Sequence, residues 1–140
     1  MGENKGGLSL ISCSGTAEKL LPVGILSSTA AAMGVPVKIF VTGFALASFM
    51  KGGIKDKPRF AKEFEDMVPK LVAGMQRLKA PSWYDLLKKA KQTGEVKVYA
   101  CSTTADMLGL KKGDFDPIID DIVGAATFMQ ESAGTQTLFI

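Results

Sequence analysis

The sequence of 140 residues contains no histidine. This absence excludes the Ser-His-Asp and Cys-His mechanisms, histidine acid–base catalysis and imidazole metal sites. Cysteine is almost as scarce, since only Cys13 and Cys101 are present. Two thiols are too few for a four-cysteine zinc site, for an iron–sulfur cluster held by one chain or for a secreted disulfide framework. We therefore expect a protein of a reducing compartment, the cytoplasm, with no cofactor.

The chain also lacks a strong charge of one sign. Its formal net charge is +3, and its basic residues are scattered among acidic ones, so nothing indicates nucleic acid as a partner. Apolar residues make up 46% and charged residues 22% of the sequence, which is typical of a folded chain rather than a disordered one. The length fits a single domain, 1–140, and the apolar content leaves surface for contacts between subunits.

No apolar run is long enough to cross a membrane without interruption. The most apolar stretch extends from Val23 to Met50, but Gly34, Pro36 and Lys38 divide it into pieces that are each short for a bilayer. The segment from Met1 to Gly7 is polar and glycine-rich, and a strand pattern follows it rather than the apolar core of a signal peptide. We expect no stable membrane insertion.

Continuous apolar runs alternate with amphipathic stretches along the chain. The runs predict buried strands at 8–11, 37–41, 96–100, 122–123 and 137–140. N-cap residues and terminating glycines predict a first helix that follows the turn at 12–16 and ends at about 33. They predict further helices at 44–50, 60–78, 82–92, 102–110, 116–121 and 125–132. Pro22 is expected in the first turn of the first helix. This alternation predicts an α/β fold with a mainly parallel sheet of about five strands, covered on both faces.

A long stretch, 42–95, separates the second predicted strand from the third, although one crossover helix needs far fewer residues. We expect a helical excursion at about 51–94, which opens on a basic loop from Lys51 to Arg59. An apolar stripe at spacings of three and four follows, and it consists of Phe64, Met67, Val68, Leu71, Val72, Met75 and Leu78. We expect this stripe to pack partly against another subunit and the basic loop to lie at the mouth of a Cys101 pocket. Pro69 is expected to kink the helix rather than end it.

Cys101 is the candidate catalytic residue. It ends the strand pattern Val96 to Ala100 and precedes a predicted helix, and ligands of parallel sheets collect at this edge, where helix N-termini lie. Free backbone N–H groups at such sites can lower a thiol pKa from about 8.5 to about 3.5–7.5. The hydroxyls of Ser102, Thr103 and Thr104 are candidate anion-stabilising donors. The alternative is a buried cysteine that packs as a small hydrophobic residue.

Cys13 also follows a strand pattern and precedes a polar turn of Ser14, Gly15 and Thr16. It is a candidate relay thiol, although cysteine more often packs in a core. The backbone amides of the turn are candidate anion-stabilising groups, but the turn lacks a full dinucleotide or phosphate-loop pattern. Nothing in the sequence makes the strands of Cys13 and Cys101 neighbours. We expect their Cα atoms to lie farther apart than the distance of about 7 Å that a disulfide allows.

Carboxylates gather near the C-terminus without the spacing of an EF-hand. They are Asp114, Asp116, Asp120 and Asp121. Asp116 and Pro117 form an N-cap and first-turn pair, which predicts a turn of helix through Asp121 and accounts for Asp116. We therefore expect no metal site here.

Cys101 lies in the run Tyr99–Leu110, with the sequence YACSTTADMLGL. This run resembles the cysteine segment of the DsrE/DsrF-like family, in particular the branch often labelled DsrE-like or "peroxiredoxin family". Further agreement lies at 14–16, 30–34 and 124–128, so the resemblance spans nearly the whole chain. One departure is TGFAL at 42–46, where the branch has an aromatic-rich stretch with a tryptophan.

The resemblance implies a three-layer α/β/α fold, a homo-oligomer and a sulfur carrier or sulfurtransferase that holds a persulfide or thiosulfonate adduct on Cys101. Its partner would be a sulfur-carrier protein or a small anionic sulfur donor. Such transfer needs a thiolate but neither histidine nor metal. Two alternatives stay open. One is a thiol redox protein, although neither cysteine lies in a Pro-x-x-x-Thr-x-x-Cys or Cys-x-x-Cys context. The other is a non-catalytic oligomeric protein that binds a small anion or a partner.

Overall fold

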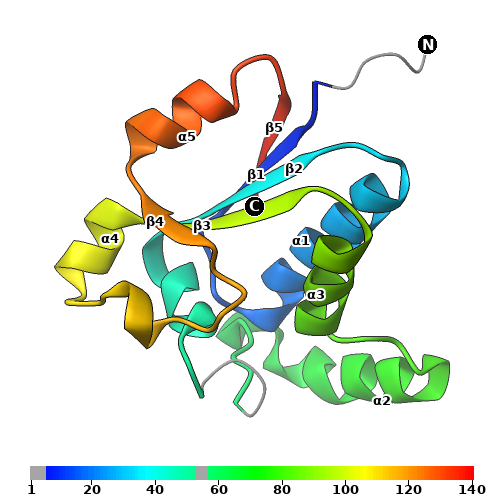
Figure 1. Ribbon diagram of the computed structural model, residues 1–140. Coiled ribbons are helices and arrows are strands. Elements are labelled where there is room, and N and C mark those ends of the chain that lie inside the picture. The colour runs from blue at the N-terminus through cyan, green and yellow to red at the C-terminus, as the bar shows by residue number, and fades with distance from the viewer. Residues whose placement is uncertain (1–5, 53–56) are drawn as a thin grey trace.

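A parallel sheet of five strands, in the order β4-β3-β2-β1-β5, forms the centre of the structure (Figure 1). The computed structural model describes residues 6–52 and 57–140. The strands are β1 (Leu8–Ser12), β2 (Val37–Val41), β3 (Val96–Cys101), β4 (Asp121–Val123) and β5 (Gln136–Phe139). Ser12 pairs with Val41, and Val41 pairs with Ala100. The carboxyl ends of the three central strands therefore meet at one edge, and the predicted parallel α/β architecture is confirmed.

Helices cover the sheet on both faces. The α-helices are α1 (Ala17–Ala32), α2 (Val68–Leu78), α3 (Trp83–Thr93), α4 (Ser102–Met107) and α5 (Ala125–Glu131), and the 3-10 helices are η1 (Gly43–Phe49), η2 (Lys62–Met67) and η3 (Lys112–Asp114). Figure 1 shows α1 and α3 on one side of the sheet and α5 on the other. Across the described ranges, no helix combines the length and apolarity that a membrane crossing requires.

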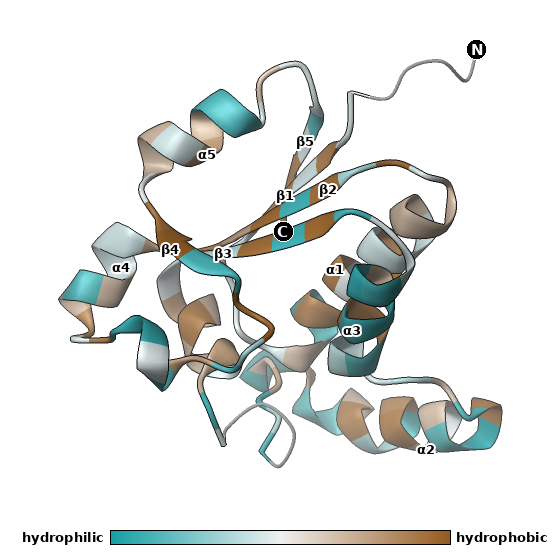
Figure 2. Cartoon of the chain, viewed as in Figure 1, coloured by the Kyte–Doolittle hydropathy of each residue, from teal (hydrophilic) through white to brown (hydrophobic). Residues whose placement is uncertain are grey.

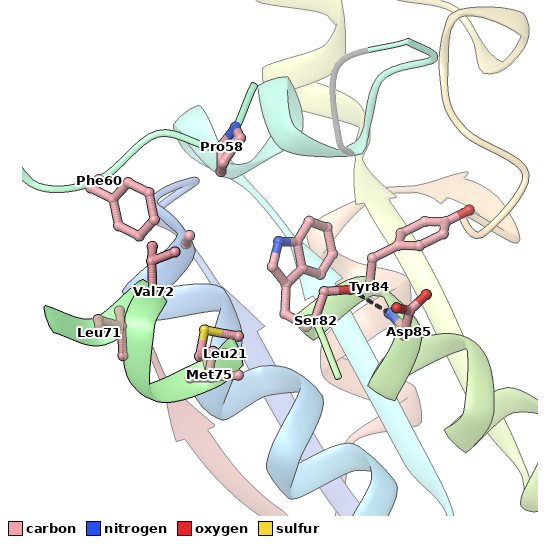
Figure 3. A pocket seen from close by; sticks show the side chains of 11 residues that line it. Leu21, Pro58, Phe60, Leu71, Val72, Met75, Ser82, Tyr84 and Asp85 are labelled. Carbon is pink, nitrogen blue, oxygen red and sulfur yellow. Dashed lines mark hydrogen bonds between the residues drawn. The ribbon is translucent and has the colours of Figure 1, made fainter. Parts of the chain in front are cut away.

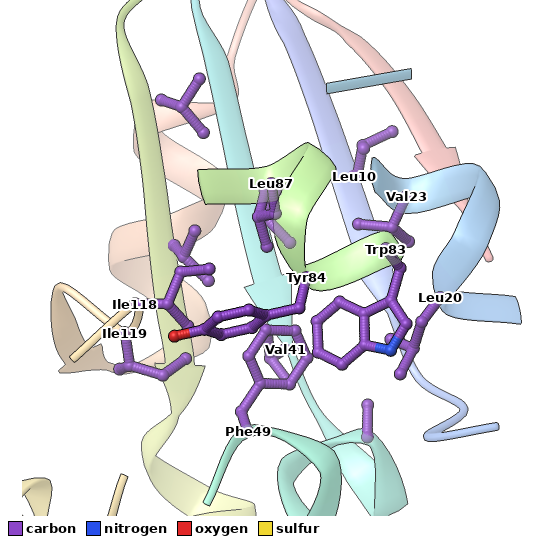
Figure 4. Close-up of a cluster of buried hydrophobic side chains, with 14 of the residues drawn as sticks. Leu10, Leu20, Val23, Val41, Phe49, Trp83, Tyr84, Leu87, Ile118 and Ile119 are labelled. Carbon is purple, nitrogen blue, oxygen red and sulfur yellow. The ribbon is translucent and has the colours of Figure 1, made fainter. Parts of the chain in front are cut away.

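The strands are apolar throughout because alternate side chains enter two separate clusters. On the α1 and α3 side, Leu10, Ile39 and Val98 are fully buried together with helix residues such as Leu20 and Leu87 (Figure 4). The opposite side holds a smaller cluster of Phe40, Cys101 and Phe128, in which the two phenylalanine rings stack with centroids 4.7 Å apart. Figure 2 shows the resulting hydrophobic colouring along the central strands. The candidate thiol thus belongs to the smaller cluster.

Glycines allow α1 and α3 to approach closely. A Cβ atom at Gly24 would lie 2.9 Å from the carbonyl oxygen of Trp83 and 3.1 Å from the Cβ of Leu86. A Cβ at Gly94, which ends α3, would lie 3.0 Å from the Cβ of Ala31. The small residues of α1 therefore serve close packing against α3.

Three local predictions were wrong. Pro22 lies in the second turn of α1, because the helix begins directly after the turn at 14–16; the cost is one missing hydrogen bond to the carbonyl of Glu18. Residues 116–120 form a turn rather than a helix. The reason is Asp120, whose N–H donates to the Val98 carbonyl and whose carboxylate accepts from the Val98 N–H, both at 2.8 Å. These bonds draw the segment alongside β3.

The segment 60–78 is also not one kinked helix. The 3-10 helix η2 ends at Met67, and α2 begins at Val68 with Pro69 in its first turn. A proline in that position loses no intrahelical hydrogen bond, so it starts a helix without strain. Phe64, at φ −121° and ψ 20°, interrupts the helical backbone. The apolar spacing continues through both helices, which made them look like one.

The stripe on η2 and α2 is not buried within the chain. Phe64 and Met67 are 56% and 55% exposed, and no residue of α2 is buried. Leu71, Val72 and Met75 instead line an open groove of about 410 Å³ with residues of α1 and α3, as Figure 3 shows. Hydrophobic and hydrophilic residues alternate around α2 in Figure 2. The expected cover by another subunit stays a prediction.

We expect Gly24→Ala to lower the free energy of unfolding by about 1–3 kcal/mol, because the added methyl group must push α1 away from α3. Alanine is otherwise the better helix former by about 1 kcal/mol. Urea denaturation measures the change. The matched control is Gly74→Ala in α2, where a Cβ would meet only the Arg77 guanidinium, at 3.8 Å. The control should be neutral or slightly stabilising, and equal stabilisation by both substitutions would contradict the packing described.

Candidate functional site

Three polar side chains stand in a row where the central strands end. Because Ser12, Val41 and Ala100 are paired in register, the residues that follow them, Cys13, Thr42 and Cys101, lie side by side along the edge. Adjacent strands are about 4.8 Å apart, which separates the two cysteines by about 10 Å across β2. That exceeds the disulfide limit of about 7 Å. The strand order thus agrees with the expectation that the thiols are not paired, and both are free.

Cys101 is both buried and placed at a helix start. It is the last residue of β3, and α4 begins at Ser102. Its extended backbone, at φ −69° and ψ 120°, turns the chain from strand to helix. Only 6% of its surface is exposed, since it packs with Phe40 and Phe128. The sequence left two alternatives for Cys101, a buried packing position and a position at the free N–H groups of a helix start. In the structure Cys101 has both.

Two threonine hydroxyls connect the Cys101 thiol to the neighbouring strand. The Thr104 hydroxyl donates to the Cys101 Sγ at 3.6 Å. The Thr42 hydroxyl lies 3.3 Å from the Thr104 hydroxyl, and the Gly43 N–H donates to the Thr104 oxygen, also at 3.3 Å. The Gly43 N–H that donates to Thr104 polarises the Thr104 O–H bond, and a polarised donor binds a thiolate more strongly.

The Cys101 pKa lies below the ordinary thiol value. Burial by itself raises it, because an apolar environment disfavours the charged form. Hydrogen bonds from the Thr104 N–H, the Thr42 and Thr104 hydroxyls and the Thr103 N–H outweigh the effect of burial. The site therefore holds a larger thiolate fraction at neutral pH than a free cysteine does.

The candidate residues around Cys101 contribute different groups to the site. Thr104 contributes its side chain and its backbone N–H, whereas Thr103 contributes its N–H. The Ser102 side chain lies toward Gly124, where a Cβ would be 3.6 Å from its Oγ. Sequence reasoning noted the departure TGFAL at 42–46 but did not name Thr42 as a site residue. Its position directly after a strand was a further signal, but that signal becomes useful only when β2 is known to adjoin β3.

Cys13 lies in a different environment. It is half-buried and lines a cavity of about 480 Å³. The predicted turn, Ser14, Gly15 and Thr16, lines this cavity too, as do Lys19, Phe44, Ala47, Ser48, Arg59, Phe139 and Ile140. The structure thus brings the turn together with Cys13, and Cys101 does not line this cavity.

The turn is held against η1 by close contacts. A Cβ at Gly15 would lie 2.7 Å from the Phe44 carbonyl oxygen, so no larger residue fits without movement. The Ser48 hydroxyl donates to the Gly15 carbonyl at 2.6 Å. The Ser14 and Thr16 hydroxyls are 3.1 Å apart. This packing fixes one wall of the Cys13 cavity.

The first turn of α1 anchors the end of the basic loop. The Ala17 N–H donates to the Arg59 carbonyl at 2.7 Å, and the Ala61 N–H donates to the Glu18 carboxylate at 3.1 Å. The Thr16 hydroxyl also donates to Glu18. Burial raises the pKa of Glu18, but these hydrogen bonds outweigh it and the pKa is lowered. Arg59 is thereby held at the Cys13 cavity, which corrects the expected position beside Cys101. Residues 53–56 of the loop lie outside the described residues.

The C-terminal carboxylates have partners within the chain. Asp116 accepts hydrogen bonds from the Tyr84 hydroxyl and the Ile118 N–H, at 2.8 and 2.9 Å. Asp114 accepts from the Lys111 N–H at 2.8 Å, and Asp120 is paired with Lys91. In the portions of the chain that the structure describes, no group of three or more metal-ligating side chains is placed to hold an ion.

Comparisons with known proteins bear on the whole chain. The sequence is 29% identical to the sulfur carrier protein DsrE2 of Allochromatium vinosum, over 88% of this chain and 90% of that protein. The fold is similar to that of the crystal structure of the YchN protein of E. coli, with a TM-score of 0.60 and 13% identity, over 96% of this chain and 98% of that one. It also resembles a protein of unknown function, MTH1491 of Methanobacterium thermoautotrophicum, with a TM-score of 0.51 and 14% identity over 95% and 96% of the two chains.

The family comparison covers almost the whole sequence. A family model matches residues 4–139, which is nearly the full length. The two solved structures share the fold at low sequence identity, so they support the architecture alone. The chain belongs to the DsrE/DsrF/DrsH-like family.

Proposed function

We propose that this protein is a sulfur carrier, or a sulfurtransferase, that holds sulfur on Cys101. The observation that carries the proposal is the hydrogen-bond chain from Thr42 and Thr104 to the Cys101 thiol, which favours the thiolate. A relative with matching length is named a sulfur carrier protein. The reducing cytoplasm, where a free thiol persists, is the compartment that suits this role.

The chemistry requires only a thiolate and a sulfur donor. The Cys101 thiolate attacks the outer sulfur of a donor such as thiosulfate, the sulfur–sulfur bond of the donor breaks, and sulfite leaves with the electron pair. The persulfide that remains on Cys101 is anionic and accepts the same hydrogen bonds as the thiolate. An acceptor thiolate then attacks the outer sulfur, and Cys101 leaves as the thiolate. With tetrathionate the thiolate attacks one of the two central sulfurs, which leaves a thiosulfonate adduct on Cys101 and releases thiosulfate.

Burial of Cys101 suits storage of sulfur rather than rapid turnover in solvent. The thiol packs with Phe40 and Phe128, and the Thr104 hydroxyl of α4 donates to its sulfur. Because only 6% of Cys101 is exposed, bulk water has little access to an adduct held there. Met107, the last residue of α4, and Leu108, directly after it, are exposed and form an apolar surface over which an acceptor protein would approach.

Sulfur loading tests the assignment to Cys101. After exposure to polysulfide or thiosulfate, the wild-type chain is expected to gain sulfur mass that a reductant removes, and peptide mapping should place this mass on Cys101. Cys101→Ser should lose that loading, whereas Cys13→Ser is the matched control and should retain it on Cys101. Reductant-labile sulfur that persists elsewhere in Cys101→Ser, with none on Cys101 in the control, would overturn the proposal.

Removal of the Thr104 hydroxyl tests the hydrogen-bond chain. Thr104→Val should raise the pKa of Cys101, because the thiolate loses a donor, and should slow alkylation at pH 7 several-fold. The alkylation rate plotted against pH should have its midpoint below that of a free thiol in the wild type and closer to it in the variant. Thr103→Val is the matched control, since its exposed side chain is lost while its N–H remains. Identical pH profiles for all three proteins would contradict the role of Thr104.

We also propose that the protein is a homo-oligomer in which a second copy covers the stripe on η2 and α2. Light scattering at micromolar concentration should give a mass above that of one chain. Phe64→Ser combined with Met67→Ser should shift the mass toward the monomer, since both side chains are more than half exposed in the single chain. Met33→Ser, at a site that is 69% exposed beyond the end of α1, is the control. A monomeric wild type would count against the interface.

A further inference from the structure

The cavity at Cys13 combines a thiol with two cationic side chains. Lys19 and Arg59 line it and are exposed. In the part of the chain that the structure describes, neither forms an ion pair. Phe44 and Phe139 line the same cavity and are 81% and 71% exposed. The volume of about 480 Å³ lies within the usual range for small-molecule sites.

The charges around this cavity favour an anion. Among the described residues that line it, every charged side chain is basic. The nearest acidic side chain in sequence, Glu18, lines a different groove and accepts hydrogen bonds from the Thr16 hydroxyl and the Ala61 N–H. Glu18 nevertheless lies beside the cavity, since Thr16, which donates to it, belongs to the lining. Although burial raises the pKa of Glu18, Lys19 helps to lower it. Two cationic side chains, Lys19 and Arg59, thus face one neighbouring carboxylate side chain, which leaves a net positive charge at the cavity.

We propose that this cavity binds a small anion that contains a sulfur–sulfur bond and that Cys13 reacts with it there. The Cys13 thiolate attacks one sulfur of the bond and the sulfur–sulfur bond of the ligand breaks. An organic disulfide leaves a mixed disulfide on Cys13 and releases a thiolate with the electron pair, whereas tetrathionate leaves a thiosulfonate adduct and releases thiosulfate with the electron pair. Atoms and electrons balance without an added oxidant. Two sources share this chemistry: organic disulfides with carboxylate groups, and inorganic polythionates. The exposed phenylalanines provide apolar contacts for the carbon chain of an organic ligand.

This site does not depend on sulfur transfer at Cys101. Strand β2 lies between the two cysteines, and Cys101 does not line the Cys13 cavity. The two thiols therefore face separate surroundings and are tested separately. A failure to load sulfur on Cys101 would not affect the Cys13 proposal. A failure of Cys13 to react with anionic disulfides would likewise not affect the proposal for Cys101.

A series of disulfides of similar size and different charge tests the proposal. The probes are dithiodipropionate, a dianion; hydroxyethyl disulfide, which is neutral; and cystamine, a dication. Peptide mapping of the full wild-type chain gives the rate at each cysteine. Cys13 should react with the dianion about tenfold faster than with the neutral disulfide at low salt, and slowest with the dication. Added salt should narrow these differences, because it screens exposed charges.

Variants that lack the two positive charges distinguish electrostatic attraction of the ligand from simple accessibility of the Cys13 thiol. Lys19→Gln with Arg59→Gln should abolish the preference for the dianion while the rate with the neutral disulfide stays within about twofold. The matched control is Lys89→Gln with Lys97→Gln, which removes the same charge at exposed positions outside the cavity lining and should keep the preference. Tetrathionate serves as the inorganic arm. Because thiosulfate leaves more readily than an alkyl thiolate, the rates of tetrathionate and dithiodipropionate at Cys13 are each divided by the rate at a small free thiol, and the larger enhancement identifies the source of the ligand. Equal rates across the charge series, an unchanged preference in Lys19→Gln/Arg59→Gln, or modification confined to Cys101 would overturn the proposal.

Discussion

The parallel register of β1, β2 and β3 is the constraint on which both thiol sites depend. Ser12, Val41 and Ala100 are paired side by side, so the residues beyond them form a row at one edge. A slip of one residue in β3 would turn every side chain to the opposite face. Cys101 would then leave Phe40 and Phe128 for the α1 side, and Thr42 would lose its place beside Thr104. The chemistry of the edge is therefore decided by backbone pairing far from any reactive atom.

The same edge produces two thiols with different properties. Cys101 is buried, and neutral hydroxyl and N–H donors stabilise its charged form. Cys13 is partly open to solvent, and the charges that surround it belong to Lys19 and Arg59. Stabilisation by buried dipoles is little affected by salt, whereas attraction by exposed cations is screened. Because β2 separates the cysteines, a redox cycle that closes a disulfide between them would require the sheet to deform, which weakens the redox alternative.

Patterns in the sequence predicted correctly those features that depend on residues close together in the chain. The continuous run at 37–41 and the position of Cys101 before a helix followed from burial and capping, and the strand β2 has the predicted bounds. Thr42 was missed because its role arises from the adjacency of β2 and β3, and no local pattern encodes strand order. The helix at 60–78 was misread because the apolar spacing continues through η2 and α2. The turn at 116–120 was misread because the bonds between Asp120 and Val98 outweigh the capping signal of Asp116.

The long excursion between β2 and β3 serves more than one purpose. Its last helix, α3, is the crossover that covers the sheet, and the contacts of Gly24 and Gly94 fix it against α1. Its first part is held at Ala17 and Glu18, which brings Arg59 to the Cys13 cavity. Between these two anchored parts, α2 has no buried residue, so its free energy of packing within the chain is small. A helix with an apolar stripe gains stability mainly from covering that stripe. The stripe is thus the feature of this chain that a second surface would stabilise most, and the anchors on both sides keep it in place without fixing what covers it.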